Sequence, residues 1–324
     1  MPEMRLRPRM LAVVFLAAVA SARGDSDAEA LARFKSEYPA ASKRLEDPFH
    51  QVKGSCLLSI VPPGESRPTR SDEATFALDH GHEMVAIKRK QAQDVGELLY
   101  CIGPDTTFYL TRLPGAKSFV ANGVGSTSLD RSAYVTLFGR FVKAHFACFG
   151  QPLTRLMARP EFRVVGAQYV NTTGQPSNAG AHSLVKVDFE SETQASRSNM
   201  SVVFDPDAQW IIRSSEYRVE GPSRMRITTD VEYGPARDGV YLPRRVTCRD
   251  GGGESSICEF RDWSFEPTPE EEFKPTHYGL PNLVDQAGAT RSLLPYWLGG
   301  LGAATFMAAV LLRRYVSRAR SSLA

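Results

Sequence analysis

The sequence lacks the short motifs that mark common catalytic sites. It contains no G-x-S-x-G nucleophile elbow and no paired-carboxylate motif. Its 5 cysteines and 6 histidines do not have the spacing of a zinc site. At His80-Gly81-His82 no cysteine or second histidine pair lies nearby to complete a metal shell, so we expect an exposed turn there. We predict a protein that is not an enzyme and has no catalytic residues, metal or cofactor, although a triad assembled from distant residues stays open.

The sequence also lacks a basic cluster outside its two ends. The formal net charge is +3, from 39 basic and 36 acidic residues. The ends hold Glu3 and seven arginines, namely Arg5, Arg7, Arg9, Arg313, Arg314, Arg318 and Arg320. Without them, 32 basic and 35 acidic residues remain, a net charge of about −3. A nucleic-acid-binding face needs clustered positive charge, so we expect no nucleic-acid partner.

Long apolar runs are absent except at the two ends. Near the N-terminus, three arginines precede an uncharged run at 10–20 and small residues that suit a cleavage site. This order is typical of a secretory signal peptide, which we assign to residues 1–22. The run is shorter than the roughly 20 apolar residues that a membrane span needs. An N-terminal anchor that is never cleaved is the alternative.

The second apolar run, residues 292–312, is uncharged. Tyr296 and Trp297 lie near one end, as in the aromatic belts of membrane spans, and arginines follow directly in 313–324. We predict a single-pass type I protein of the cell membrane, with a transmembrane helix at 292–312, a cytoplasmic tail at 313–324 and the bulk of the chain periplasmic or extracellular. The acidic, then polar stretch 267–291 predicts a linker. The alternative is a transient anchor, because some bacteria cleave a similar C-terminal sorting signal.

The exported part, residues 23–266, has the pattern of an α+β domain that is mainly antiparallel β. One amphipathic helix is expected from Asp25 to Asp47, with Pro39 kinking or splitting it. A second helical stretch is expected from about Leu129 to Phe149, with a block of strands before it and another after it. The strands of the first block are expected at 55–61, 74–78, 83–88, 97–102, 106–111 and 117–121, and the second block runs from 161 to about 265.

The strand blocks contain about a dozen short strands without long crossovers, which predicts antiparallel pairing. A sheet of that size has to curl or split. We therefore expect one strongly curved sheet or half-open barrel. The N-terminal helix and the mid-chain helical lid should cover its open side.

A late hairpin adds a resemblance to a known family. The pattern Val231-Glu232-Tyr233, followed by Asp238-Gly239-Val240-Tyr241-Leu242-Pro243-Arg244-Arg245-Val246, is similar to a hairpin of LolA/LolB-type lipoprotein-localisation factors. The order of elements over residues 28 to 265 resembles that family as well. The resemblance implies an incomplete antiparallel barrel with an apolar cavity for an acyl chain. The ends depart from it, because the carriers lack a transmembrane tail.

Two alternating strand segments supply the residues that we nominate for a ligand cavity. They are Val185, Val187, Phe189, Met225, Ile227 and Val231. We predict that they bind a lipid, an acyl chain or a lipoprotein by apolar burial, with the membrane as the other partner. The alternative is a protein-interaction or envelope-sensing module whose barrel is filled by its own side chains.

The cysteines suggest one disulfide. Cys248 and Cys258 flank the turn Asp250-Gly251-Gly252-Gly253-Glu254. A hairpin centred on Gly253 would place them directly opposite each other, at a separation that a disulfide can bridge. Two buried free thiols are the alternative, and a Cys56–Cys101 bond is a further possibility.

Overall fold

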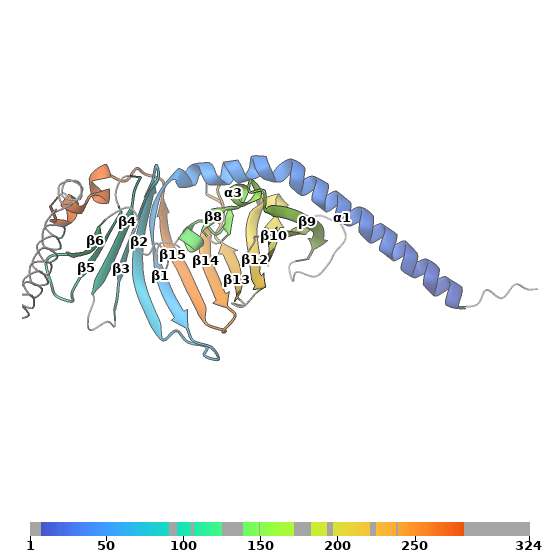
Figure 1. Cartoon of the computed structure of the whole chain (residues 1–324), viewed down its shortest axis with the longest axis horizontal. Coiled ribbons are helices and arrows are strands. Elements are labelled where there is room, and N and C mark those ends of the chain that lie inside the picture. Colours follow the sequence, from blue (N-terminus) through green and yellow to red (C-terminus); the bar gives the residue numbers. More distant parts are fainter. Residues whose placement is uncertain are drawn as a thin grey trace, which may run out of the picture. The chain divides into compact units, whose positions relative to one another are not determined.

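The computed structural model describes residues 8–90, 96–104, 107–124, 139–148, 150–171, 183–192, 197–220, 225–237 and 239–281, with side chains from residue 26 onward apart from Val124. The chain divides into two units, residues 1–273 and 274–324. The first unit contains the sheet and the helices that cover it (Figure 1). In the second unit, the described part contains a short 3-10 helix, η4 (Pro275–Tyr278).

The first unit is built on one sheet of 13 strands in which all neighbouring strands are antiparallel. Their order is β6-β5-β4-β3-β2-β1-β15-β14-β13-β12-β11-β10-β9. The strands are β1 (Gln51–Val61), β2 (Arg70–Asp79), β3 (His82–Lys88), β4 (Glu97–Ile102), β5 (Thr107–Arg112), β6 (Val120–Val124), β9 (Phe162–Val170), β10 (Leu184–Glu192), β11 (Arg197–Asp205), β12 (Ile211–Glu220), β13 (Met225–Tyr233), β14 (Pro243–Asp250) and β15 (Ser255–Ser264).

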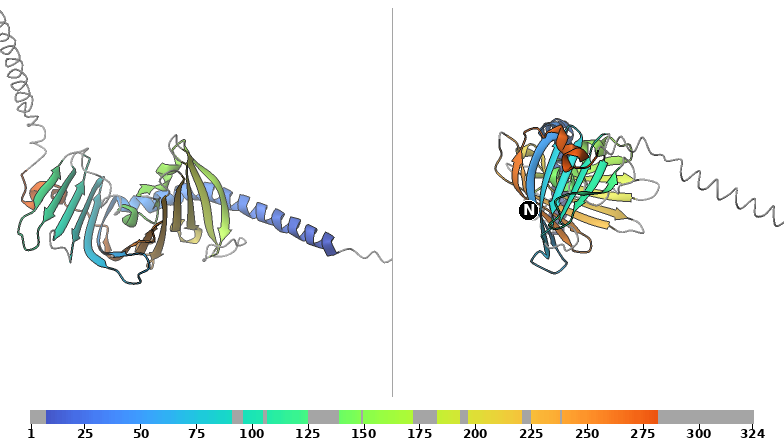
Figure 2. Two further views of the ribbon diagram at one scale, coloured as in Figure 1. Left: turned by 60° about the horizontal axis from the view of Figure 1, so that its bottom comes forward. Right: turned by 90° about the vertical axis from the view of Figure 1, so that its left-hand side faces the viewer.

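This sheet confirms the predicted antiparallel architecture. Five of the six expected early runs coincide with strands, whereas the run expected at 117–121 is strand only from residue 120, where β6 begins. Figure 2 shows that the sheet curves along its length. Within the described residues, β6 and β9 are edge strands that each pair on one side, so the sheet is open and does not close into a barrel. The β2–β3 turn is the exposed turn expected at His80-Gly81. Its two central residues both have positive φ, 43° and 92°, as in the tight turns that favour hairpins.

Helix α1 (Pro8–Glu46) crosses one end of the sheet and continues into η1 (Asp47–His50). The sequence allowed for a split at Pro39, but the helix continues through this residue. Proline removes one backbone donor, which leaves the carbonyl of Lys35 without its helical partner. Both residues are exposed, so water can satisfy that carbonyl. Further short elements are β7 (Ala147–Cys148), β8 (Gln151–Pro152), α3 (Leu153–Met157), η2 (Pro206–Ala208) and η3 (Glu270–Phe273).

Two hydrophobic cores lie on one face of the sheet. The first, here called the α1 core, joins Phe34 and Tyr38 of α1 to side chains of β9–β12 such as Phe189 and Phe204. The second core lies over β1–β4 and β13–β15 and is covered by Phe49 and by residues 141–147. Strand register shows that the two cores share a face. Tyr217 of β12, which packs on the α1 core, is paired with Ile227, and Val231 on the same side of β13 lies in the second core.

The mid-chain helix ends earlier than predicted. In the described part of this stretch, residues 139–142 are helical and 143–146 form a turn, so the prediction of helix up to residue 149 was wrong at its C-terminal end. The reason lies in the hydrogen bonds. The carbonyl of His145 accepts from Ile212 N of β12 at 3.0 Å, and β7 then pairs with β8. The segment still covers the sheet as the predicted lid would, because Phe141 and Val142 are fully buried.

The predicted ends lie largely outside the described residues. This holds for residues 1–7 of the signal peptide, for the transmembrane segment at 292–312 and for the tail at 313–324. Among the helices that the structure describes, none combines the length and the apolar content needed to cross a membrane. Residues 267–273, at the start of the predicted linker, belong to the first unit, where the carbonyl of Phe273 accepts a hydrogen bond from the Cys101 thiol at 3.4 Å.

Candidate functional site

The three cavity residues nominated on β10 lie in the α1 core. Val185 and Val187 are fully buried, and Phe189 is 1% exposed. The ring of Phe189 lies 6.0 Å from that of Phe34 on α1, edge to face, and 5.3 Å from that of Phe162 on β9. Because α1 occupies this part of the face, these side chains pack as ordinary core.

The three residues nominated on β13 separate along the strand. Val231 is 5% exposed and belongs to the second core, whereas Met225 at the other end is 44% exposed. Ile227 lies between them and is 9% exposed. The structure therefore does not bring the six nominated residues into one cavity. Met225 and Ile227 alone among them line an open hollow.

This hollow lies where β12 ends, β13 begins and β14 turns into β15. It has a volume of about 1070 Å³, the size of a small-molecule site, although it is open to solvent. Its lining residues are Arg218, Val219, Glu220, Met225, Arg226, Ile227, Asp250, Gly251 and Gly252. Sequence reasoning missed Val219 because it nominated no residue of β12. It missed Gly251 and Gly252 because the turn that places them beside β13 was expected to be centred one residue later.

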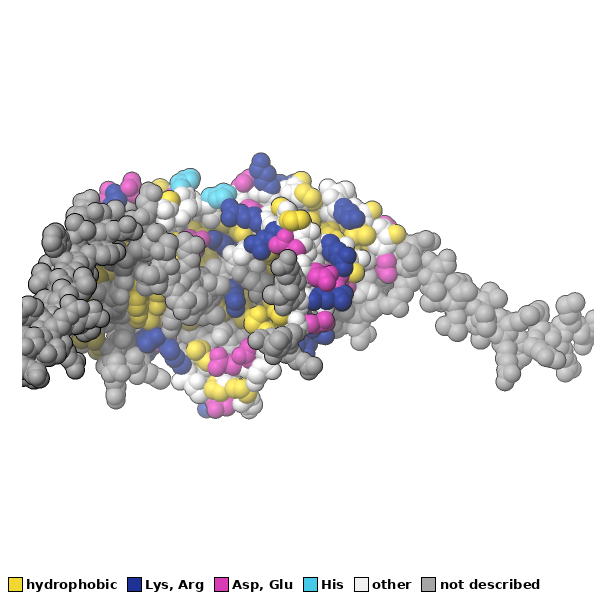
Figure 3. All heavy atoms as spheres, in the orientation of Figure 1, with side chains coloured by type: hydrophobic (Ala, Val, Ile, Leu, Met, Phe, Trp, Pro, Cys, Tyr) yellow, Lys and Arg dark blue, Asp and Glu magenta, His cyan; other side chains and the backbone are white. Residues whose placement is uncertain are grey.

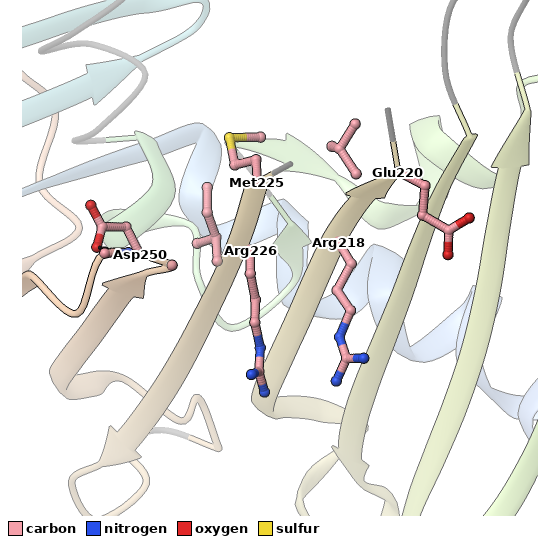
Figure 4. Close-up of a pocket in the computed structure, with 9 residues that line it drawn as sticks. Arg218, Glu220, Met225, Arg226 and Asp250 are labelled. Atoms are coloured by element: carbon pink, nitrogen blue, oxygen red, sulfur yellow. Dashed lines mark hydrogen bonds between the residues drawn. The ribbon is translucent and has the colours of Figure 1, made fainter. Parts of the chain in front are cut away.

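Charged and apolar groups of the hollow point to different sides. Figure 4 shows the side chains of Arg218 and Arg226 running parallel, away from the side on which Met225 lies. This follows from strand alternation, since Arg226 is flanked by Met225 and Ile227. The hollow therefore has an apolar side, here called its floor, and a charged side, here called its rim.

The two arginines of the rim are held by one carboxylate. Glu216 accepts a hydrogen bond from Arg218 Nε at 2.5 Å and another from Arg226 Nε at 2.6 Å. These hydrogen bonds, with Arg218 first, hold the pKa of Glu216 below its ordinary value. The guanidinium groups are therefore already partly neutralised and do not form a free anion site.

The turn beside the hollow is fixed by Asp250. Its Oδ1 accepts from the backbone N–H of Gly252 and of Glu254, each at 3.0 Å. Its backbone N–H donates to the carbonyl of Glu254 at 3.1 Å. This pairing centres the hairpin on Gly252.

The hairpin register predicted for the cysteines was therefore wrong by two residues. Cys248 lies opposite Ser256, and Cys258 lies opposite Val246. The predicted disulfide between them is not present, and all five cysteines are free and buried. The Cys56–Cys101 bond is also absent, because β2 and β3 lie between β1, which carries Cys56, and β4, which carries Cys101. Cys248 and Cys258 are diagonal neighbours on one face of the hairpin. The separation of diagonal neighbours is too large for a disulfide unless the backbone moves.

Burial makes four of the thiols poor nucleophiles. Burial raises the pKa of Cys101 and of Cys148 to about 12 and lifts the pKa of Cys258 well above its ordinary value. Burial also raises the pKa of Cys248, with a smaller opposing effect from a hydrogen bond to Thr229. No group of three His, Cys, Asp or Glu side chains in the described part of the chain is arranged to hold a metal ion.

One buried histidine escaped sequence reasoning. His145 is fully buried, and its ring lies 4.0 Å from that of Phe49 and 4.5 Å from that of Phe146. Burial, partly offset by the backbone of Leu45, lowers the pKa of His145 to about 3. Its neutral ring therefore behaves as part of the second core. The periodic apolar pattern around residue 141 was the available signal for its burial.

Comparison with known proteins adds two similarities of fold. No protein-family model and no curated protein matches the chain. Among solved structures, it is similar to the LolA superfamily protein NE2245 from Nitrosomonas europaea, with 11% identity and a TM-score of 0.42 over 74% of this chain and 99% of that one. It is also similar to MucB in complex with MucA(peri), with 9% identity and a TM-score of 0.15 over 71% of this chain and 98% of that one. At such TM-scores neither similarity identifies a ligand, and the relation to LolA/LolB-type carriers stays a prediction.

Proposed function

We propose that this protein is an exported, membrane-tethered binding module that takes up the apolar part of a lipid, an acyl chain or a lipoprotein. The observation that supports this most directly is the open hollow, with Val219, Met225 and Ile227 as its apolar floor. Met225 is 44% exposed and therefore presents apolar surface to a ligand in the hollow. Covering apolar surface there would contribute about 25 cal/mol per Å². This binding needs no catalytic residue, in keeping with a protein that is not an enzyme.

Lipid binding is tested by native mass spectrometry of the purified full-length chain, with extraction and identification of any lipid that co-purifies. We expect a retained lipid and saturable binding of a fluorescent fatty acid. Met225→Glu should weaken that binding about tenfold or more, because it places a charge on the apolar floor. Leu113→Glu is the matched control, since Leu113 is 56% exposed and lies outside the hollow. Equal binding by both variants would show that the hollow is not the site.

A protein-interaction or envelope-sensing module is the second candidate. The packing of the face that carries the two cores favours it. In the described residues, α1 fills one part of this face with Phe34 and Tyr38, and Phe141 and Phe146 fill another. A long acyl chain could enter there only by displacing these aromatic side chains. Protein capture by lipid-free chain that is lost in Met225→Glu, with no lipid retained in wild type, would favour this second function.

The tether is part of the proposal and has its own test. We infer that residues 1–22 direct export, that 292–312 span the membrane and that 313–324 face the cytoplasm. Protease added to intact spheroplasts should then digest residues 23–291 and leave a small C-terminal fragment. Release of the intact chain by a high-salt wash would contradict a membrane span, and loss of the C-terminal residues during maturation would indicate a cleaved sorting signal.

A further inference from the structure

A second cleft lies beside the C-terminal end of α1, away from the hollow at β12–β13. It has a volume of about 570 Å³ and lies where the end of α1 and η1 meet the β2–β3 turn, the 143–146 turn and the corner between β8 and α3. It shares no lining residue with the hollow at β12–β13. Figure 3 shows histidine, lysine and arginine side chains close together on the upper side of the molecule.

The lining of this cleft has more basic groups than acidic ones. Lys143, Arg155 and Arg159 supply positive charge, and His50 and His82 add two imidazoles. Glu46 and Glu83 are the two carboxylates. The carboxylate of Glu83 is paired with the ammonium of Lys143.

The second carboxylate is also engaged. Glu46 Oε1 accepts hydrogen bonds from the hydroxyls of Ser42 and Thr154, both at 2.9 Å. The Glu46 carboxylate therefore links α1 to α3, and the partners of its Oε1 are hydroxyl groups rather than cations. Neither carboxylate of the cleft has an ion pair with Arg155 or Arg159 in the part of the chain that the structure describes.

The two arginines have spare hydrogen-bonding capacity. Arg159 donates from Nη2 to the neutral Gln151 Oε1 at 2.6 Å, and Arg155 has no hydrogen bond or ion pair among the described residues. They are four residues apart, and the turn between them continues α3, since Arg159 N donates to the Leu156 carbonyl at 3.1 Å. This spacing places both on one side of the turn. Guanidinium groups bind phosphate oxygens in pairs, with charge-assisted hydrogen bonds.

We propose that this cleft binds a phosphate-type oxyanion, through the guanidinium groups of Arg155 and Arg159 with His50 and His82 as neighbouring polar groups. The oxyanion is either free phosphate or the phosphate of a lipid head group. The proposal is independent of the acyl-binding function, because the two sites have no residue in common.

The test is calorimetric titration of the full-length chain, in neutral detergent and chloride buffer, with inorganic phosphate. Wild type should bind phosphate, and Arg155→Ala/Arg159→Ala should weaken binding on the order of tenfold or more. Arg155→Lys/Arg159→Lys, which keeps the charge and loses the paired geometry, should fall between them. The matched control is Arg67→Ala/Arg244→Ala, which removes two exposed arginines that lie outside the cleft. All variants should keep the wild-type Tm, because the four arginines are exposed.

A second titration distinguishes the two sources of phosphate. A short-chain phosphatidic acid, kept below its micelle concentration, should bind at least tenfold more tightly than inorganic phosphate if the head group is the ligand, and equally if it is free phosphate. In both cases the alanine double variant should lose affinity and Met225→Glu should not. The proposal is overturned if wild type binds neither compound, or if the alanine double variant binds as wild type does.

Discussion

The α1 core and the second core lie on the same face of one sheet but are covered by different kinds of segment. A regular helix covers the first, with Phe34 stacked on Tyr38 at 4.9 Å and Trp210 edge-on to Phe34 at 5.8 Å. The turn at 143–146 and the short strand β7 cover the second core. There the fully buried His145 lies among aromatic rings. The helix satisfies its own backbone, whereas the turn depends on β12 for a partner. Because His145 is buried beside Phe49 of the second core, acid should destabilise the second core more than the first.

The largest effect is expected from removing the ring at the centre of the α1 core. Phe34→Ala leaves a cavity among Phe189, Phe204 and Trp210 and should lower the free energy of unfolding by about 3–5 kcal/mol. Urea unfolding followed by tryptophan fluorescence measures it. In a chain whose only tryptophan is Trp210, with Trp263 and Trp297 replaced by Phe, Phe34→Ala should also change the fluorescence of the folded state.

The control for this change is Val165→Ala on β9. Val165 is 61% exposed, so its truncation should cost less than about 0.5 kcal/mol. A loss for Phe34→Ala no larger than that of the control would mean that α1 does not cover the sheet.

The next largest effect separates the two cores by pH. The pKa of His145 is about 3 in the folded chain, below the value of about 6.5 in an unfolded one. The unfolded chain therefore binds the proton first, and stability is lost as pH falls below about 6.5, by up to about 1.4 kcal/mol per pH unit. The loss ends near pH 3, where the folded chain is also protonated.

His145→Phe tests this assignment, because phenylalanine keeps an aromatic ring and cannot be protonated. Urea unfolding between pH 7 and pH 4 should show a shallower loss of stability in His145→Phe than in wild type. His80→Phe, in a turn where the side chain is 78% exposed, should keep the wild-type slope. The same slope in all three chains would show that His145 is not the group responsible.

The cysteines give a smaller difference between the cores. Cys148 lies in the α1 core with a hydrogen bond to Ser215, whereas Cys258 lies in the second core beside Cys56. Cys258→Ser should cost about 1–3 kcal/mol, because it buries a polar hydroxyl in an apolar core with the Cys56 thiol as its side-chain neighbour. Cys148→Ser should cost less, because Ser215 can accept or donate. Thermal unfolding of the two variants measures the difference, and a larger cost for Cys148→Ser would reverse the expected order.

Much of the fold was predictable, because strand alternation and helical spacing depend on local sequence. The strand expected at 97–102 has the bounds of β4, and Phe34 and Tyr38 lie in the buried stripe of the predicted helix. The hairpin register was not predictable, since it depends on the two hydrogen bonds that Asp250 Oδ1 accepts within the turn. The site was less predictable still. Val187 and Ile227 follow the same alternating pattern, and the position of α1 across the sheet decides that one lies under a helix and the other beside an open hollow.

The smallest effect concerns the contact that ties α1 to the sheet. Trp210 Nε1 donates to Glu37 Oε2 at 3.0 Å, and Arg33 Nε donates to the same carboxylate at 3.2 Å. Trp210→Phe keeps an aromatic ring but removes the donor, and it should cost about 1 kcal/mol from the hydrogen bond together with a packing loss. Glu37→Gln keeps an acceptor for Trp210 and should cost less. Because this contact is made only in the α1 core, Trp210→Phe should leave the acid-dependent loss assigned to His145 unchanged. If Trp210→Phe altered that loss, the two cores would be coupled through β12, where Ile212 N donates to the carbonyl of His145 two residues beyond Trp210.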